Sequence, residues 1–225
     1  MSTYQVLIPA YNAAITLPVL LEQLAAFRPE PAAIVVVNDG SNDQTESICA
    51  DYGITVINLE KNSGKGSALK RGFTAFLMDS DVAYVLCMDA DLQHPVESIG
   101  DFLSKADRDQ SKFIIGARDC SFRAMPFHRI LSNKITSYII SLLAKKKIID
   151  SQCGFRLIHR DVLRQIAFSE EGYQLESEMI ISAARKGIQI DAVDIPTIYG
   201  KEVSHIGHVK DTLLFIRLIL REIFR

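Results

Sequence analysis

Short apolar runs rich in β-branched residues recur along the first half of the chain, and a polar turn follows most of them before a helical pattern begins. These runs predict strands over residues 5–9, 33–37, 55–59 and 82–88. The apolar spacing after them predicts helices over residues 17–27, 45–52, 66–79 and 96–106. Strands that alternate with helices are typical of a mostly parallel, Rossmann-like sheet with helices on both faces.

The second half of the chain has a less regular pattern. Residues 113–118 and 190–198 are expected to form strands, and residues 127–143 an amphipathic helix. No repeat or linker separates the halves, and 225 residues suit one larger α/β domain. We therefore expect a single domain over residues 1–208 and a C-terminal amphipathic helix over residues 209–225.

The composition narrows the class of protein. Hydrophobic residues make up 48% and charged residues 23% of the chain, which excludes a disordered or collagen-like protein. The net charge of −2 gives no reason to expect nucleic acid as a partner. The four cysteines show no CxxC spacing, so a reduced, cytoplasmic setting is expected. We find no signal peptide and no apolar run of about 20 residues that would span a membrane.

Two carboxylates leave the apolar run of residues 82–88 at its carboxyl end, where open α/β sheets bind their ligands. Asp89 and Asp91, with Gln93 after them, offer the hard oxygen ligands that Mg²⁺ or Mn²⁺ prefers, and substrate phosphates would complete the shell. A pair of solvated loop acids is the alternative. Their position directly after a buried strand favours the metal site.

A second polar turn, residues 38–43, follows the apolar run of residues 34–37. Asp39 is expected to contact a nucleotide base or ribose, and Asp43 to cap the following helix. Lys65 lies between two glycines at a helix start, where it could meet a phosphate. This is not a P-loop, because Leu59 stands where that motif needs a glycine, and an ordinary strand-to-helix turn is the alternative.

Taken together, five short motifs occur in one order: Pro9-Ala10-Tyr11-Asn12, Asn38-Asp39-Gly40-Ser41, Gly64-Lys65-Gly66, Asp89-Ala90-Asp91-Leu92-Gln93-His94-Pro95 and Ser151-Gln152-Cys153-Gly154-Phe155-Arg156. Over about residues 4–205 the chain resembles the family 2 glycosyltransferases of the GT-A fold. It is similar in particular to the branch that includes dolichol-phosphate mannosyltransferase and other polyprenyl-phosphate glycosyltransferases.

The resemblance implies a donor site and a metal site. It implies contacts to a UDP- or GDP-sugar at Pro9, Ala10, Tyr11, Asn12, Asp39, Lys65, Asp89, Ala90, Asp91, Glu176 and Glu178. It implies that Mg²⁺ or Mn²⁺ is held by Asp89, Asp91 and Gln93. Ala13 stands where many relatives carry a glutamate, so one donor contact cannot be carried over.

The resemblance also implies an inverting displacement, with catalytic roles at Asp91, Arg118, Arg129 and Asp150. A hydroxyl acceptor needs a general base, and Asp150 is the candidate. A phosphate acceptor is already anionic and needs only positioning. Its candidate contacts are Arg118, Arg129, Ser132 and Lys201, since guanidinium forks match phosphate geometry. Each arginine could instead be a partner in a surface ion pair.

Two helical segments favour an acceptor in a membrane. The C-terminal helix is apolar over a wide arc and carries a basic stripe of Lys210, Arg217, Arg221 and Arg225, a pattern that suits a membrane surface. The helix over residues 127–143 is followed by Lys145, Lys146 and Lys147, which suit anionic headgroups. Packing on the core or on a second copy is the alternative. We expect a peripheral protein on the cytoplasmic face of the membrane, held there directly or by a membrane-protein partner.

The preferred hypothesis is transfer of a sugar to a polyprenyl phosphate. The alternatives are transfer to a hydroxyl of a glycan or lipid in cell-surface polysaccharide synthesis, and a non-catalytic scaffold that binds a nucleotide sugar. An NAD-dependent Rossmann enzyme is disfavoured because no GxGxxG follows the first strand.

Overall fold

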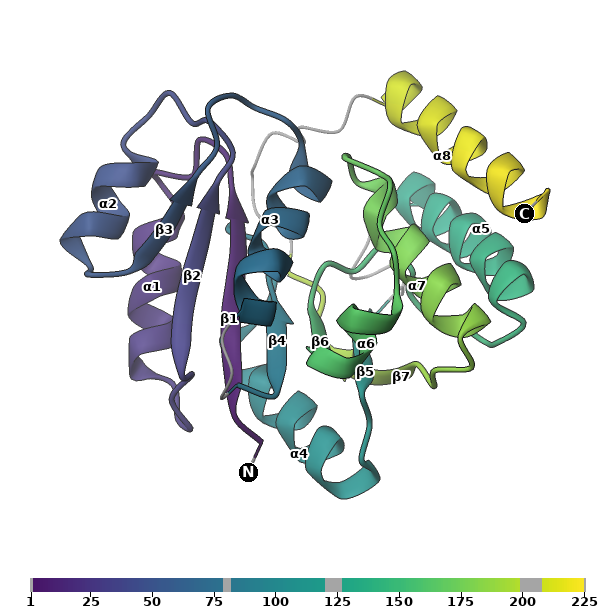
Figure 1. The fold of residues 1–225 in the computed structure, drawn as a ribbon, viewed down its shortest axis with the longest axis horizontal. Coiled ribbons are helices and arrows are strands. Elements are labelled where there is room, and N and C mark those ends of the chain that lie inside the picture. The colour runs from purple at the N-terminus through teal and green to yellow at the C-terminus, as the bar shows by residue number, and fades with distance from the viewer. Residues whose placement is uncertain (1, 79–81, 120–126, 199–207, 225) are drawn as a thin grey trace.

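The computed structural model describes residues 2–78, 82–119, 127–198 and 208–224. Across these residues one mixed sheet runs in the order β3-β2-β1-β4-β6-β5-β7 (Figure 1). Its strands are β1 (Tyr4–Ala10), β2 (Ala33–Asn38), β3 (Thr55–Asn58), β4 (Tyr84–Cys87), β5 (Phe113–Arg118), β6 (Arg156–His159) and β7 (Asp191–Ile195). The expected strands are confirmed; β4 and β7 are shorter than predicted, and β6 was not predicted.

Helices follow the strands as expected in the first half. The helices of the first half are α1 (Leu17–Ala26), α2 (Thr45–Asp51), α3 (Lys65–Met78), the short 3₁₀ helix η1 (Val96–Ser98) and α4 (Ile99–Asp109). Those of the second half are α5 (Phe127–Ala144), α6 (Arg160–Gln165), α7 (Gln174–Arg185) and α8 (His208–Ile223). The sequence did not predict α6 and α7.

The sheet is mostly parallel. β1, β2, β3 and β4 pair in parallel, as do β5 and β7, whereas β6 runs antiparallel to both β4 and β5. The parallel strands β1, β2 and β4 therefore end at one edge of the sheet, and the polar turns that follow them meet there. This is the edge at which the sequence predicts the ligand site.

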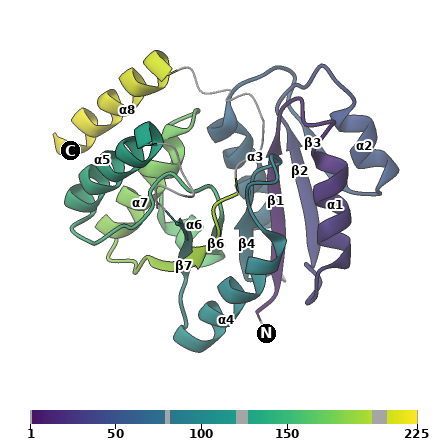
Figure 2. The same cartoon turned by 180° about the vertical axis from the view of Figure 1, so that it is seen from behind.

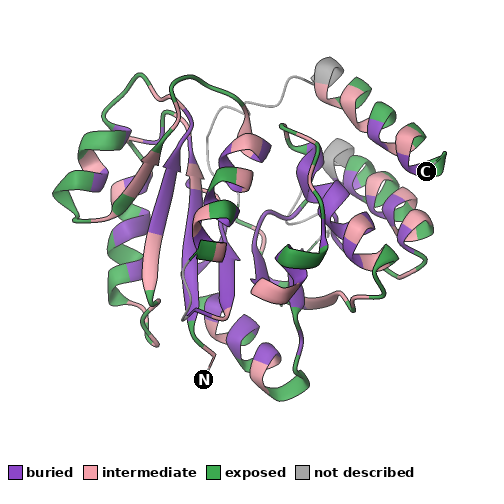
Figure 3. Cartoon of the chain, in the orientation of Figure 1, coloured by how far each residue is buried: buried purple, intermediate pink, exposed green. Residues whose placement is uncertain are grey.

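Helices cover both faces of the sheet. α3 lies in front of β1 and β4 in Figure 1, and α4 lies in front of the sheet when it is seen from behind in Figure 2. Gly72 lets α3 approach β1 closely, because a Cβ at this position would collide with the side chain of Leu7. The central strands are buried, the edge strand β3 is partly exposed, and the outer sides of the helices are exposed (Figure 3), as expected for a layered α/β domain.

α5, α7 and α8 form a group beside the β5–β7 end of the sheet (Figures 1 and 2). α7 contacts both α5 and α8. No helix in the described part of the chain is long and apolar enough to cross a membrane.

Candidate functional site

The loops after β1 and β2 are joined by hydrogen bonds at the carboxyl edge of the sheet. The backbone N–H of Asn12 donates to Ser41 Oγ at 2.9 Å, and the N–H of Asn42 donates to Asn12 Oδ1 at 2.9 Å. Asn12 adopts a positive φ of 52°, a conformation that asparagine tolerates better than most residues. The structure thus places the predicted Pro9–Asn12 and Asn38–Ser41 motifs side by side.

Asp39 joins this edge to the loop that precedes α3. Its side chain is buried, and its two carboxylate oxygens accept the N–H groups of Ser63 and Gly64, each at 2.8 Å. Burial raises the pKa of Asp39, while the two backbone N–H groups act in the opposite direction. Asp43 was expected to cap α2, but the N-cap residue is Gln44. Asp43 instead accepts the N–H groups of Thr45 and Ala14, each at 3.0 Å, and so joins the loop after β1 to the start of α2.

Lys65, the first residue of α3, lies between two carboxylates. Its Nζ is 2.6 Å from Asp89 Oδ1 and 2.8 Å from Glu176 Oε1. Burial alone would lower the pKa of Lys65, but the charges of Asp89 and Glu176 outweigh it and raise the pKa. The group brings together three of the predicted donor residues from three separate segments, and it carries one negative charge in excess.

Gly154 and His94 pack around Asp89, and the sequence assigned neither of them a role. A Cβ on Gly154 would lie 2.7 Å from Asp89 Oδ2, 2.9 Å from Lys65 Nζ and 3.1 Å from Glu176 Oε1. His94 Nδ1 accepts the N–H of Asp89 at 3.0 Å, and burial lowers the pKa of His94 to about 4. The histidine is therefore neutral and orients the Asp89 backbone. Both residues lie in motifs that carried the resemblance, which was the one signal that pointed to them.

The candidate metal ligands follow β4. Leu92 adopts a positive φ of 60°, and Asp91 Oδ1 accepts the N–H of Gln93 at 3.0 Å. Within the described ranges, no three His, Cys, Asp or Glu side chains are grouped closely enough to enclose a metal ion. The residues nevertheless fit the kind of Mg²⁺ or Mn²⁺ site that uses one or two carboxylates and takes its remaining ligands from substrate phosphates and water.

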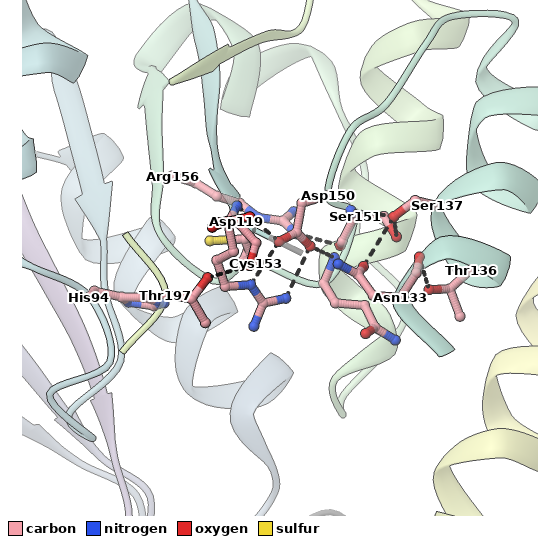
Figure 4. Close-up of polar contacts among 12 residues, drawn as sticks. His94, Asp119, Asn133, Thr136, Ser137, Asp150, Ser151, Cys153, Arg156 and Thr197 are labelled. Atoms are coloured by element: carbon pink, nitrogen blue, oxygen red, sulfur yellow. Dashed lines mark hydrogen bonds and ion pairs between the residues drawn. The ribbon is translucent and has the colours of Figure 1, made fainter. Parts of the chain in front are cut away.

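Arg118, at the end of β5, pairs with Asp150, which precedes β6. Arg118 Nε lies 2.7 Å from Asp150 Oδ2, and Nη2 lies 3.0 Å from Oδ1. The Asp150 side chain is fully buried. Figure 4 shows Asp150 beside the turn of Ser151 and Arg156 and close to Ser137 of α5. The structure thus joins the predicted general base to one of the predicted phosphate ligands.

Arg156 links this turn to α7. Its guanidinium is fully buried and donates to the carbonyl oxygens of Cys153 at 2.8 Å, Ser151 at 2.9 Å and Glu176 at 2.6 Å. Three carbonyl acceptors satisfy a cation that would otherwise be costly to bury. Arg156 thereby fixes the backbone of Glu176, whose side chain contacts Lys65.

Glu178 belongs to a different set of contacts from Glu176. Its Oε2 accepts the N–H groups of Ser169 and Glu170, each at 2.9 Å, and its Oε1 lies 2.9 Å from Arg221 Nη2 on α8. Positions two apart on a helix point in widely different directions, because each residue turns the helix by about 100°. The structure therefore does not bring Glu178 to the Lys65 group.

The predicted acceptor residues are only partly described. Ser132 is exposed on α5, and its carbonyl accepts Thr136 Oγ1 at 2.9 Å. Arg129 lies on the first turn of α5, but its side chain is outside the described part, and Lys201 lies outside the described residues altogether. Of the predicted acceptor cations Arg118, Arg129 and Lys201, the structure describes side-chain contacts for Arg118 alone.

α5 and α8 expose apolar side chains. Those more than a third exposed are Leu131, Ile135, Tyr138 and Leu142 on α5, and Leu213, Ile216, Leu220 and Ile223 on α8. A groove of about 630 Å³ beside α5 is lined by Lys134, Lys145, Lys146 and Lys147, together with hydroxyl and apolar side chains. The predicted basic stripe of α8 needs one correction. Arg221 turns inward to Glu170 and Glu178 because these carboxylates are nearly buried, whereas Arg217 is exposed.

Two solved synthases share the fold of this chain. Mannosyl-3-phosphoglycerate synthase from Rubrobacter xylanophilus superposes with a TM-score of 0.78 at 18% identity, over 100% of this chain and 73% of that one. Glucosyl-3-phosphoglycerate synthase from Mycobacterium tuberculosis, in complex with Mn²⁺, UDP and glucosyl-3-phosphoglycerate, gives a TM-score of 0.75 at 18% identity, over 99% and 78% of the two chains. The fold class is therefore a single GT-A-like α/β domain, with the charged group at the carboxyl edge of its sheet.

Residues 5–167 match the model of the family described as glycosyl transferase family 2. The chain belongs to this family and is a glycosyltransferase. It is 30% identical to dolichol-phosphate mannosyltransferase of Pyrococcus furiosus, over 98% of this chain and 62% of that protein. It is 24% identical to dolichyl-phosphate beta-glucosyltransferase of Trichomonas vaginalis, over 94% and 71%. It is 30% identical to undecaprenyl-phosphate 4-deoxy-4-formamido-L-arabinose transferase of Pectobacterium atrosepticum, over 87% and 60%.

Proposed function

We propose that this glycosyltransferase moves a sugar from a nucleoside diphosphate sugar to a polyprenyl phosphate at a membrane surface. The observation that carries the choice of acceptor is the Arg118–Asp150 ion pair. A hydroxyl acceptor needs a general base, but the candidate base is buried and its two oxygens accept from Arg118 and from Gln152 N. A phosphate acceptor is already ionised and needs only cations to position it.

The donor lies at the carboxyl edge of the sheet in this proposal. The loops after β1 and β2 hold the nucleoside, and Lys65 at the start of α3 meets the diphosphate. Lys65 is held 2.6 Å from Asp89 and is nearly buried, so it is a preorganised cation rather than a mobile surface lysine. A cation of this kind binds phosphate as a point charge, and the N-terminus of α3 adds its dipole.

Asp89, Asp91 and Gln93 would hold Mg²⁺ or Mn²⁺ together with the donor diphosphate. The solved structure of the M. tuberculosis synthase, which shares the fold, contains Mn²⁺ and UDP. When bound, the metal would neutralise negative charge on the departing diphosphate. This chain's own residues orient the carboxylates. His94 accepts the backbone N–H of Asp89, and the backbone N–H of Gln93 donates to the Asp91 carboxylate.

The acceptor phosphate would approach from the side of α5, where Arg118 is held in a fixed orientation by Asp150 and where Arg129 and Ser132 lie. Three relatives are named for dolichyl, dolichol or undecaprenyl phosphate, which supports this class of acceptor. The chain spans about three fifths of the length of two of these relatives.

The apolar faces of α5 and α8 would rest on the membrane that contains the lipid acceptor. Burial of several large apolar side chains supplies the main attraction, and lysines beside them add attraction to anionic headgroups. Lys134, Lys145 and Lys147 line the groove beside α5 and suit this role. The same faces could instead bury against a second copy of the chain, which sedimentation in the absence of lipid would reveal.

The test is a transfer assay with a panel of UDP- and GDP-sugars in Mn²⁺. Matched acceptors are a polyprenyl phosphate and the polyprenol without its phosphate, both in anionic vesicles. We expect product only with the phosphate and only with one donor class, and loss of product in Asp91→Asn. Product formed only on the polyprenol or on a glycan hydroxyl would refute the proposed acceptor.

A further inference from the structure

Arg221 of α8 lies among three carboxylates where α8 meets α7. Its Nη1 is 2.7 Å from Glu170 Oε1, its Nη2 is 2.9 Å from Glu178 Oε1, and its Nε is 3.1 Å from Glu222 Oε1. Glu222 also pairs with Arg185 of α7. The side chains of Glu178 and Glu222 are only 4% and 3% exposed, so their charges depend on these arginines for compensation.

Through Glu178, this contact reaches the turn that precedes α7. The Oε2 atom of Glu178 accepts the N–H groups of Ser169 and Glu170, each at 2.9 Å, and Ser169 Oγ also donates to the same carboxylate. Arg221 binds that carboxylate and the side chain of Glu170 at once. Its guanidinium therefore holds the turn from two sides.

The next residues of the turn press against the start of α3. The carbonyl of Glu171 accepts the N–H of Ser67 at 3.0 Å. A Cβ on Gly66 would lie 2.6 Å from the carbonyl carbon of Glu171 and 2.6 Å from the carbonyl oxygen of Gly172, so the two backbones touch. Lys65 lies in this contact, and its Nζ is 5.9 Å from the ring centroid of Tyr173.

We infer that the C-terminal helix positions the donor site, and that Arg221 is the positioning residue through which it acts. Arg221 binds the carboxylates of Glu170 and Glu178, and these two residues hold the turn of residues 169–172. The turn in turn holds the first residues of α3, which include Lys65. Its role toward the donor rests on the proposed function, in which Lys65 meets the diphosphate. The coupling between α8 and α3 rests on the contacts alone. Because α8 is also the helix proposed to lie on the membrane, docking there would stabilise the same contacts.

The test compares Arg221→Gln with Arg217→Gln, a matched change at an exposed arginine one turn earlier on α8. Hydrogen exchange of the Ser67 and Glu170 amides reports the coupling, and calorimetric titration with UDP or GDP in Mn²⁺ reports the donor site. In Arg221→Gln we expect both amides to exchange about tenfold faster and the nucleotide Kd to rise about tenfold, within the range of coupling between neighbouring groups. Arg217→Gln should match the wild type.

Several outcomes separate this inference from the proposed function. Unchanged exchange at Ser67 in Arg221→Gln would overturn the coupling, and faster exchange with wild-type nucleotide affinity would overturn the positioning role, since a merely structural residue lowers only stability. If the wild type binds no nucleotide while Ser67 exchange still rises in the variant, the proposed donor function fails and the coupling stands. Should Arg221→Gln not fold, Arg221→Lys replaces it, because an ammonium keeps the charge but cannot span both carboxylates.

Discussion

Arg118 and Asp150 form a two-point ion pair, with Nε–Oδ2 at 2.7 Å and Nη2–Oδ1 at 3.0 Å. The sequence assigned these residues to competing acceptors, Asp150 as base for a hydroxyl and Arg118 as ligand for a phosphate. Their pairing makes the roles dependent on each other. A carboxylate that accepts from a guanidinium and from Gln152 N is better suited to orient Arg118 than to take up a proton.

Replacement of Asp150 tests this pair. Asp150→Asn removes a buried charge and leaves Arg118 facing a neutral amide, so we expect the free energy of unfolding to fall by about 3 kcal/mol. Urea denaturation measures the loss. Asp109→Asn is the matched control, because Asp109 pairs with Arg108 at the surface, where ion pairs contribute little. Equal effects of the two substitutions would show that the Arg118–Asp150 pair contributes no more to the free energy of unfolding than a surface ion pair does.

Lys65 should compete with a metal ion for Asp89. Its ammonium lies 2.6 Å from Asp89 Oδ1, so a divalent ion at this oxygen meets a second cation. In Lys65→Met, Mn²⁺ alone should raise the melting temperature more than it does in the wild type, because it would neutralise the uncompensated Asp89 and Glu176. UDP or GDP in Mn²⁺ should bind about tenfold more weakly, through loss of a charge-assisted contact.

The control for Lys65 is Lys70→Met on the same helix. Lys70 is half-buried, and its Nζ lies 4.0 Å from Glu171 Oε1. Thermal shifts in Mn²⁺ and in nucleotide should match the wild type in this variant. A Lys65→Met protein with the wild-type response to Mn²⁺ would show that the ammonium and the metal do not share Asp89.

The pattern of apolar residues predicted most of the sheet but missed β6. This strand has four residues and begins with Arg156, whose charge argues against a buried strand in any local reading. Three carbonyl oxygens satisfy the guanidinium, and they come from the preceding turn and from α7. α7 was missed for a related reason: residues 174–181 are all buried, including Gln174 and Glu176, so no polar face marks a helical period.

The candidate site was predictable where one motif supplied it and unpredictable where distant segments meet. The Asp89 turn and Lys65 follow from their positions at a strand end and a helix start. Pairing of Arg118 with Asp150 spans 32 residues and has no local signal. Glu176 and Glu178 were assigned together through the resemblance, but both lie on α7, where positions two apart point in different directions.

Mild acidification should lower the free energy of unfolding through His159. It caps α6, and its Nδ1 accepts the N–H of Asp161 at 3.1 Å, which requires the neutral ring. Burial lowers its pKa, although the Asp161 carboxylate opposes the shift and the cations of Lys112, Arg160 and Arg164 add to it. The unfolded chain, with an ordinary pKa of about 6.5, therefore takes up a proton before the folded one does. The stabilisation is complete above about pH 6.5 and is lost as the pH falls toward the lowered pKa.

His159→Asn keeps an acceptor at the cap and removes the titration. Between pH 7 and pH 5 the wild type should lose more unfolding free energy than this variant does, and chemical denaturation at several pH values gives the comparison. The variant also loses the edge-to-face contact between the rings of His159 and Tyr84, whose centroids lie 4.8 Å apart. That loss lowers the free energy of unfolding by the same amount at every pH. Parallel curves of stability against pH would rule out His159 as the titrating group.

Gly154 should be irreplaceable in the candidate donor site, although its backbone φ does not require glycine. A methyl group there would lie 2.7 Å from Asp89 Oδ2 and 2.9 Å from Lys65 Nζ, both of which are held by partners of their own. We expect Gly154→Ala to lower the affinity for nucleotide in Mn²⁺ more than about tenfold, at a cost of about 1–3 kcal/mol in stability.

Gly100→Ala is the control: nothing lies within 4 Å of the added methyl, and alanine in α4 should stabilise the fold by up to about 1 kcal/mol. Calorimetry at equal folded fraction separates affinity from stability, and wild-type affinity in Gly154→Ala would mean that the Lys65–Asp89–Glu176 group does not bind the donor.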